Sequence, residues 1–448
     1  MYRLKWILLS SCLLAGVLSH PAGAETLDQA MLDALNHHPQ IEQAVASRSA
    51  ADETKKEEFS GYFPRLNASV AGGRVYGDNS TSRGLTVTRG AAYSGYAEGS
   101  VGVDQMLFDG FAVRNKVAAA DNRAQSADKM IANVREDLAQ KTVLAYLDVM
   151  RSADTLKQAQ DHSAKIVDYQ SRINAMVAEG AADESMSVQA RDIKAQLDLT
   201  IIDLKGQMES AAARYAEVVG HAPVMPLVKP TFNAATLPSD IDAAIKQAMT
   251  THPELQASRM AEQAYDHDIK AQKAAYYPNL NTELSYLKRD QSDLIGGEAI
   301  DARALVRMNW AWSTGGAEIA RVKKAKAQKL ESRAQRSEKE RQIESAVRSS
   351  YADMKASQDR LTLQRERLTI NEDLFKTYQA QFEGSKVNLL QLLQTDNALF
   401  NTKLGVTNAE YRLLASQYAM MAGLGQMQSL FGIVPNEATP DKSTTKSA

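Results

Sequence analysis

The side chains that could carry out chemistry are few in this chain, and their spacing matches none of three common catalytic or metal-binding motifs. Its 448 residues contain 7 histidines, and none of them lies in an H-E-x-x-H zinc motif. The sequence also lacks a G-x-S-x-G nucleophile turn and a G-x-x-x-x-G-K-S/T phosphate loop. We therefore predict no catalytic residue, no metal site and no cofactor, and we expect that the protein is not an enzyme.

Two of the histidines instead mark turns. His38 precedes Pro39, and His252 precedes Pro253. The residue before a proline disfavours the helical conformation, because the proline ring crowds its backbone. Turn geometry therefore explains both histidines better than metal ligation does.

The N-terminal segment, residues 1–24, is predicted to be a signal peptide. A basic start at Arg3 and Lys5 precedes an apolar stretch that ends before the small-residue cleavage site Ala22-Gly23-Ala24. The apolar stretch is shorter than the roughly 20 residues that a transmembrane helix needs. Cleavage would start the mature chain near Glu25 and remove Cys12, the only cysteine. Lipidation at Cys12 is the alternative that the sequence leaves open.

The charge balance gives no reason to expect nucleic acid as a partner. The formal net charge of the chain is −2. One basic run occurs, but it is followed at once by Glu338 and Glu340, so we interpret it as the solvated face of a helix. Its members are Arg321, Lys323, Lys324, Lys326, Lys329, Arg333 and Arg336.

The chain contains a long internal duplication. His38-Pro39 returns as His252-Pro253, at an offset of 253 − 39 = 214 residues. Farther on, Asp109-Gly110 returns as Thr314-Gly315, at an offset of 315 − 110 = 205 residues. A period of this length is too long for a solenoid repeat. It indicates two half-domains that together form one structural unit.

Each repeat is predicted to contain very long helices. Residues 111–179 and 317–383 contain neither proline nor glycine, so each segment can form one helix on the order of 100 Å long. A second helix follows each of them, up to Gly220 and to about Gly423. Each repeat therefore forms a tall helical hairpin of coiled-coil character.

Four segments between the helices alternate apolar with polar residues, as strands do: 66–70, 93–108, 280–286 and 304–312. Their average length of about ten residues and their alternation are typical of membrane-spanning barrel strands. Four strands cannot close a barrel, and lipid tolerates no open sheet edge. We therefore expect a barrel shared between chains, where three chains would give twelve strands and a lumen, and two would give eight and a filled interior.

The sequence thus predicts an α+β membrane protein with a shared outer-membrane β-barrel that continues into a long periplasmic α-helical barrel. The predicted segments are 1–24 signal peptide, 25–63 helices of repeat 1, 64–108 first strand pair, 109–220 first hairpin, 221–240 connection, 241–277 helices of repeat 2, 278–312 second strand pair, 313–425 second hairpin and 426–448 disordered tail.

Several motifs, in this order and in double occurrence, resemble the TolC family of outer-membrane channels. They are the two His-Pro turns, Tyr62-Phe63-Pro64 with Tyr276-Tyr277-Pro278, Leu107-Phe108-Asp109-Gly110, residues 213–220 and Leu389-Leu390-Gln391-Leu392-Leu393. The resemblance implies a homotrimer in the outer membrane of a Gram-negative bacterium, in contact with its lipid. It also implies a periplasmic adaptor (a membrane fusion protein) and an inner-membrane transporter of the ABC, RND or a similar type as partners.

The function that follows is a passive exit duct, either of a type I secretion system or of a multidrug efflux pump. The sequence leaves one alternative of another class open. It is a non-conducting periplasmic coiled-coil scaffold or adaptor that is anchored at the outer membrane.

The hairpin turns are the expected contact for an adaptor, because they lie farthest from the membrane. The residues concerned are Gly180, Ala181, Asp183, Gly384, Ser385 and Lys386, and the glycines are expected to allow the reversal of the backbone. The resemblance also implies a ring of aspartates at a closed entrance, but this chain has Gln391 and Gln394 at those positions. Asp183, Glu184 and Asp396 are nearby acids that could replace the ring.

Overall fold

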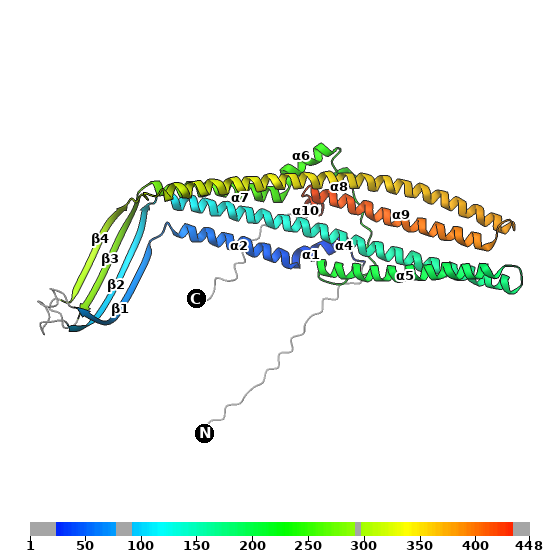
Figure 1. Cartoon of the computed structure of the whole chain (residues 1–448), viewed down its shortest axis with the longest axis horizontal. Coiled ribbons are helices and arrows are strands. Elements are labelled where there is room, and N and C mark those ends of the chain that lie inside the picture. The colour runs from blue at the N-terminus through cyan, green and yellow to red at the C-terminus, as the bar shows by residue number, and fades with distance from the viewer. Residues whose placement is uncertain (1–23, 78–91, 292–296, 433–448) are drawn as a thin grey trace, which may run out of the picture.

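A computed structural model describes residues 24–77, 92–291 and 297–432 of the chain. The molecule is elongated, with a sheet at one end and two helical hairpins that reach the other end (Figure 1). The predicted signal peptide up to residue 23 and the last part of the predicted disordered tail lie outside the described residues. No helix in the described parts of the chain is both long enough and apolar enough to cross a membrane.

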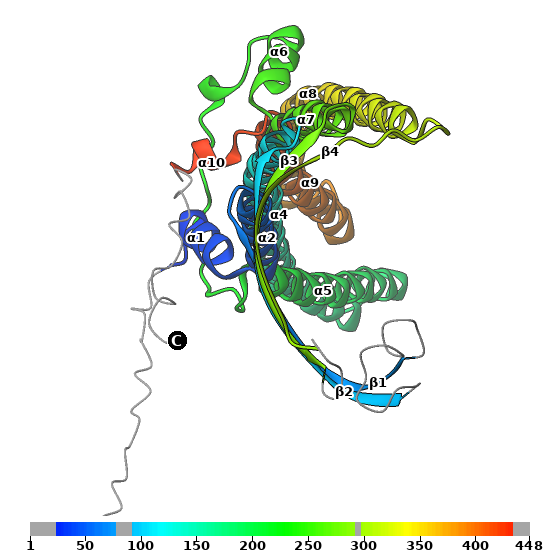
Figure 2. The same ribbon diagram turned by 90° about the vertical axis from the view of Figure 1, so that its left-hand side faces the viewer.

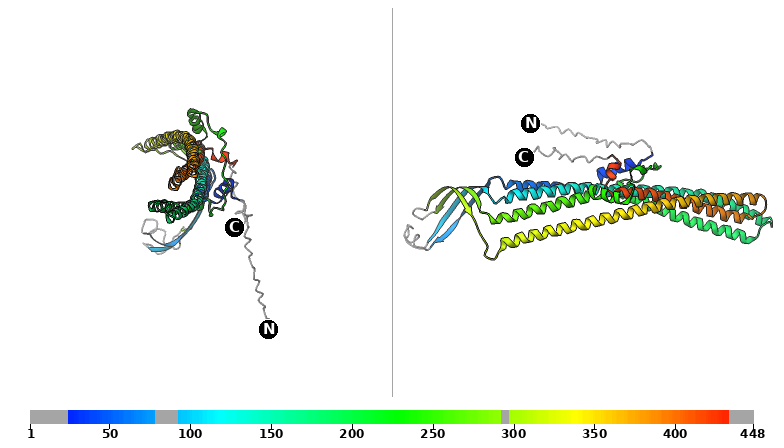
Figure 3. Two further views of the ribbon diagram at one scale, coloured as in Figure 1. Left: turned by 90° about the vertical axis from the view of Figure 1, so that its right-hand side faces the viewer. Right: turned by 90° about the horizontal axis from the view of Figure 1, so that it is seen from above.

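The long helices occur where the sequence predicts them. The first hairpin consists of α4 (Ala112–Ala178) and α5 (Glu184–Val219), and the second of α8 (Ala317–Glu383) and α9 (Leu389–Gly423). Helices α4 and α8 both have 67 residues, so the two hairpins reach the same end of the molecule (Figure 3). The duplication is therefore visible in three dimensions.

Each repeat begins with a pair of shorter helices that is broken at a His-Pro turn. These helices are α1 (Leu27–His37) with α2 (Pro39–Ser60), and α6 (Ile241–Thr251) with α7 (Pro253–Lys273). The imidazole Nδ1 of His38 accepts the backbone N–H of Gln40 at 3.2 Å, and that of His252 accepts the N–H of Glu254 at 3.3 Å. Both histidines therefore cap the second helix of the pair, in agreement with a structural role.

The four strands form a single antiparallel sheet in the order β1-β2-β3-β4. The strands are β1 (Arg65–Gly77), β2 (Ala92–Phe108), β3 (Asn279–Gln291) and β4 (Ala299–Asn309). The sequence indicated two separate pairs, but β2 of the first repeat also pairs with β3 of the second. The strand predicted up to Trp312 ends earlier, so Trp310 and Trp312 lie beyond β4.

The core lies at mid-height, where α1, α6 and the short helix α10 (Met427–Leu430) cover α4 on the convex side of the molecule (Figure 2). Tyr146 of α4 is fully buried, and its hydroxyl lies 2.9 Å from the backbone oxygen of Glu25 and 2.7 Å from that of Val228. The Glu25 carboxylate in turn accepts the Tyr215 hydroxyl and the Val224 N–H. These bonds fasten the start of the predicted mature chain to the connection between the repeats.

The C-terminal segment corrects one expectation. Residues 426–448 were expected to be disordered, but Met427–Leu430 form the short helix α10, and Met427 is fully buried. The carboxylate of Glu136 on α4 accepts the N–H groups of Met427 at 2.7 Å and of Gln428 at 3.1 Å. These bonds satisfy backbone donors that a helix start leaves unpaired, and they hold the segment against α4.

Candidate functional site

One face of the sheet is apolar and open. Paired residues of neighbouring strands share a face, and the register aligns Leu66 with Val103, Val103 with Leu284, and Leu284 with Ala304. Val70 and Val306 on this face are 92% and 68% exposed in the single chain. Apolar side chains over much of one sheet face match the lipid-facing band of a membrane barrel.

The opposite face of the sheet is polar and held by ion pairs. Arg307 on β4 binds Glu283 on β3 at 2.8 Å, and Arg289 on β3 binds Glu98 on β2 at 2.7 Å. Asn67 on β1 donates to Asp104 on β2 at 2.6 Å. This face offers charged groups and hydrogen-bonding groups to water, as the wall of an aqueous duct requires. These ion pairs were not predicted from the sequence, although their charged residues occupy alternate positions of the strands.

The first hairpin reverses at Gly180. Its backbone is left-handed, with φ = +74°, and the N–H of Ala181 donates to the carbonyl of Met176 at 2.8 Å. Asp183 then caps α5, because its carboxylate accepts the N–H of Ser185 at 2.8 Å. The first tip therefore consists of a glycine reversal and an acidic cap, and both face solvent.

The second hairpin reverses by the same hydrogen bond but at a different residue type. The N–H of Lys386 donates to the carbonyl of Gln381 at 2.8 Å, 205 residues after the bond from Ala181 to Met176. The left-handed residue is Ser385, with φ = +56°, whereas Gly384 has φ = −82°. The expectation that Gly384 supplies the reversal is therefore wrong. The 205-residue offset places Ser385, not Gly384, at the position of Gly180.

The residues expected at the entrance are divided between two environments. Asp183, Glu184, Gln391 and Gln394 are exposed near the tips. Asp396 is only 4% exposed, between α9 and α4, where its Oδ2 lies 4.0 Å from Nδ1 of His162. Asp396 therefore contacts a neighbouring helix of its own chain, and it is not a solvated acid near the tip. Burial lowers the pKa of His162, and the nearby Asp396 opposes this effect.

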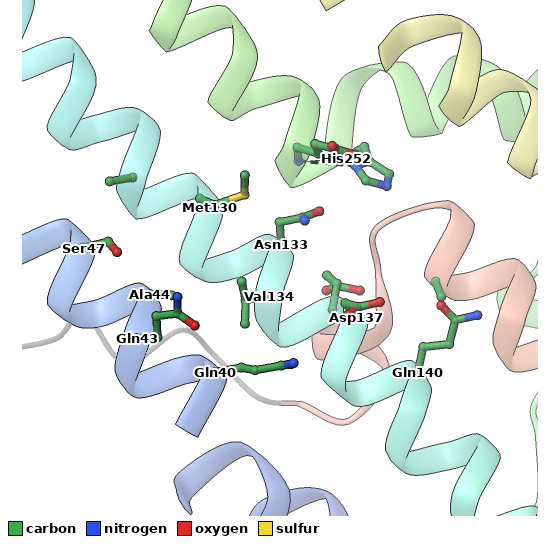
Figure 4. Close-up of a pocket in the computed structure, with 14 residues that line it drawn as sticks. Gln40, Gln43, Ala44, Ser47, Met130, Asn133, Val134, Asp137, Gln140 and His252 are labelled. Carbon is green, nitrogen blue, oxygen red and sulfur yellow. Dashed lines mark hydrogen bonds between the residues drawn. The ribbon is translucent and has the colours of Figure 1, made fainter. Parts of the chain in front are cut away.

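In the described parts of the chain, no group of three or more His, Cys, Asp or Glu side chains could hold a metal ion. A cavity of about 640 Å³ lies beside α4, and side chains of α2, α4 and the α6–α7 turn line it (Figure 4). Its wall combines amides such as Gln40, Asn133 and Gln140 with the acids Asp137 and Glu254.

Glu136 also lines this cavity, where it binds the start of α10. Burial raises the pKa of Glu136, against the opposing effect of the backbone hydrogen bonds from Gln428 and Met427. The carboxylate is thus occupied in fastening the C-terminal segment. This part of the molecule therefore has a structural role, in which Glu136 holds α10 against α4.

The comparisons with known proteins agree with a channel. The family model described as "Outer membrane efflux protein" matches residues 31–221 and 244–426. The outer membrane efflux protein BepC of Brucella suis is 24% identical over 434 residues, which cover 94% of this chain and 89% of that protein.

Solved structures share the fold at low identity. CusC superposes with a TM-score of 0.76 at 15% identity, covering 89% of this chain and 92% of that chain. The CmeC outer membrane channel of Campylobacter jejuni gives 0.75 at 14% identity, covering 89% of this chain and 85% of that chain. The outer membrane protein VceC of Vibrio cholerae gives 0.73 at 17% identity, covering 89% and 96%.

Proposed function

We propose that this chain, which belongs to the outer membrane efflux protein family, forms the exit duct of an export machine as an assembly of three copies. The family places the chain in the outer membrane with a large periplasmic part, as a passive channel and not an enzyme. The trimer, the partners and the cargo are the finer parts of the proposal.

The observation that carries the proposal is the two-faced sheet with two open edges. Among the described strands, β2 and β3 have a partner on both sides, whereas β1 and β4 have a partner on one side only. In lipid, the backbone groups of an open edge would have no water to bind. Pairing of β4 with β1 of a neighbouring copy removes both edges and repeats the pairing that β2 and β3 make within the chain.

Three copies are the number that suits a duct. Each chain gives four strands, so three chains give twelve, with room for a lumen behind the polar face. Two chains would give eight strands, whose side chains would fill the interior. The apolar face then lies toward outer-membrane lipid, and the ion-paired face lines the water-filled path.

The hairpin tips are the proposed contact for the periplasmic adaptor. An inner-membrane ABC, RND or similar transporter, reached through this adaptor, would supply the energy for export. An exposed residue at the second tip, Lys386, provides the test. Lys386→Trp is expected to reduce export and leave trimers intact, whereas Lys355→Trp, an exposed position far from the tip, is expected to leave export unchanged.

Single-channel recording in planar bilayers separates the duct from its alternative. The duct predicts stepwise conductance of the purified protein. A non-conducting scaffold anchored at the outer membrane predicts none at any voltage, and that result would refute the proposal. Deletion of the gene then identifies the cargo class, since drug hypersensitivity indicates efflux and loss of a secreted protein indicates type I secretion.

A further inference from the structure

We propose that α5 of one copy packs along α8 of the next copy, and that this seam separates when the tunnel entrance opens. In the seam, Arg191 faces Arg367 of the neighbouring copy. The inference rests on the proposed assembly, and it adds which of two similar helix contacts is the movable one.

The duplication predicts the partner of each exposed hairpin face. The 205-residue offset relates α4 to α8 and α5 to α9, and α4 packs on α9 within the chain. The equivalent contact would join α8 to α5. These two helices lie at opposite edges of the hairpin layer, so α8 can meet only the α5 of another copy (Figure 2).

The side chains at the equivalent positions support this pairing. Within the chain, Gln158 of α4 donates to Thr407 of α9 at 2.8 Å. The positions equivalent to this pair in the other repeat are Leu363 (158 + 205) on α8 and Ile202 (407 − 205) on α5. These two large apolar side chains are 64% and 63% exposed in the single chain. Apolar side chains open to water at matched heights on two edges indicate that the edges cover one another.

At one height along the helices, the seam between copies differs from the equivalent α4–α9 contact within the chain. Within the chain, His162 and Asp396 are 5% and 4% exposed, and the His162 ring stacks on Phe400 at 4.2 Å between centroids. The layer is therefore closed, and it contains an acid.

The equivalent layer between copies contains two arginines. The offset converts His162 into Arg367 (162 + 205), and it converts Asp396 into Arg191 (396 − 205). Phe400 becomes Ala195 (400 − 205), which leaves space beside the guanidinium groups. Both arginines are exposed, and no described side chain pairs with either of them. A guanidinium group keeps its charge at any physiological pH, so the two groups repel one another.

The acids next to the two arginines in the sequence, Asp192 and Glu366, are turned about 100° away around their helices, so neither shares the face of its arginine. The positions three and four residues from each arginine share its helix face. They are occupied by Ser187, Val188, Lys194, Ala195, Leu363, Gln364, Ile370 and Asn371. The seam between copies is therefore held by apolar contacts and opposed by charge at one layer, whereas the contact within the chain has no like-charge pair there. When the entrance widens, the seam between copies separates first.

A charge exchange tests the inference in single-channel recordings. Arg191→Glu places opposite charges across the seam, and we expect it to lower the open fraction on the order of fivefold. Arg191→Glu with Arg367→Glu restores like charges and is expected to restore the wild-type open fraction. The effect of the single variant should weaken in concentrated salt, because salt screens partly exposed charges. An unchanged open fraction in the single variant, or no recovery in the double variant, would overturn the inference.

Disulfide cross-linking separates a failure of the inference from a failure of the proposed assembly. Oxidised Arg191→Cys with Arg367→Cys should link copies and hold the channel closed until a reductant is added. The matched pair at the same height, His162→Cys with Asp396→Cys, should cross-link within one chain and leave opening intact. Equal blockage by both pairs would overturn the inference. Conductance steps without any link between copies would reject this seam but keep the duct, and the absence of steps in the unaltered protein would reject the assembly itself.

Discussion

Exchanging the residues at the two hairpin reversals is expected to change the local stability of the two tips in opposite directions. Gly180→Ala should weaken the first tip, because its backbone is left-handed with φ = +74°. Ser385→Gly should strengthen the second tip, because Ser385 occupies the equivalent position with φ = +56°. A Cβ at Gly180 would meet no atom within 4 Å, so the effect comes from the backbone alone.

The magnitude follows from two opposing effects. A residue with a Cβ loses about 1–2 kcal/mol in the left-handed region relative to the right-handed one. Glycine loses about 0.5–1 kcal/mol more backbone entropy when it becomes ordered. The net effect of either exchange is therefore about 0.5–1 kcal/mol, which changes a local opening equilibrium roughly two- to fivefold.

Amide hydrogen exchange of the purified protein measures these equilibria at each tip. Peptides that cover 176–190 should exchange faster in Gly180→Ala, and peptides that cover 381–395 should exchange more slowly in Ser385→Gly. Gly384→Ala is the matched control, since φ = −82° suits any residue. Faster exchange in Ser385→Gly, or an effect of Gly384→Ala as large as that of Gly180→Ala, would refute the equivalence of the two reversals.

Three further substitutions test other contacts of the fold, at Gly110, Glu136 and His221. Gly110→Ala should cost about 2–5 kcal/mol per chain and reduce heat-resistant oligomers on gels, because the new Cβ would lie 2.6 Å from the carbonyl of Ala274 at φ = +68°. Gly73→Ala, with open space around it, should be harmless. Glu136→Ala should cost about 1–3 kcal/mol and increase hydrogen exchange in α10, because buried N–H groups lose their acceptor. Burial lowers the pKa of His221, but a backbone carbonyl and two nearby carboxylates outweigh it, so the pKa is raised above 6.5. Its stabilising contribution is then complete below about pH 6.5 and is lost as pH rises through the folded-state pKa, and the fall in melting temperature over that range should be absent in His221→Gln.

Local chemistry along the chain was enough to predict the long elements. The 67-residue helices were foreseeable because no proline or glycine interrupts them, and the strands because apolar and polar residues alternate. The His-Pro breaks were predictable for the same local reason, since proline restricts the residue before it. These features depend on neighbours within a few positions.

Contacts across the duplication were not predictable in this way. The pairing of β2 with β3 joins residues that are 172 (280 − 108) to 195 (291 − 96) positions apart, and nothing local specifies it. The left-handed Ser385 escaped notice because serine carries no turn signal as strong as that of the glycine next to it. Asp396 was assigned to the entrance from its position in the sequence, but its side chain faces His162 of another helix. Such contacts depend on how two helices are rotated against each other.

The equal lengths of α4 and α8 have an evolutionary consequence. Both helices have 67 residues, and the returning helices α5 and α9 have 36 and 35. A deletion in one helix alone would leave its hairpin shorter than the other or shift the register of every layer below it. Changes in the height of this protein should therefore be inherited as coordinated insertions or deletions in all four helices. Descendants with taller or shorter bodies should differ by similar lengths in both repeats, while their turns and strands vary freely.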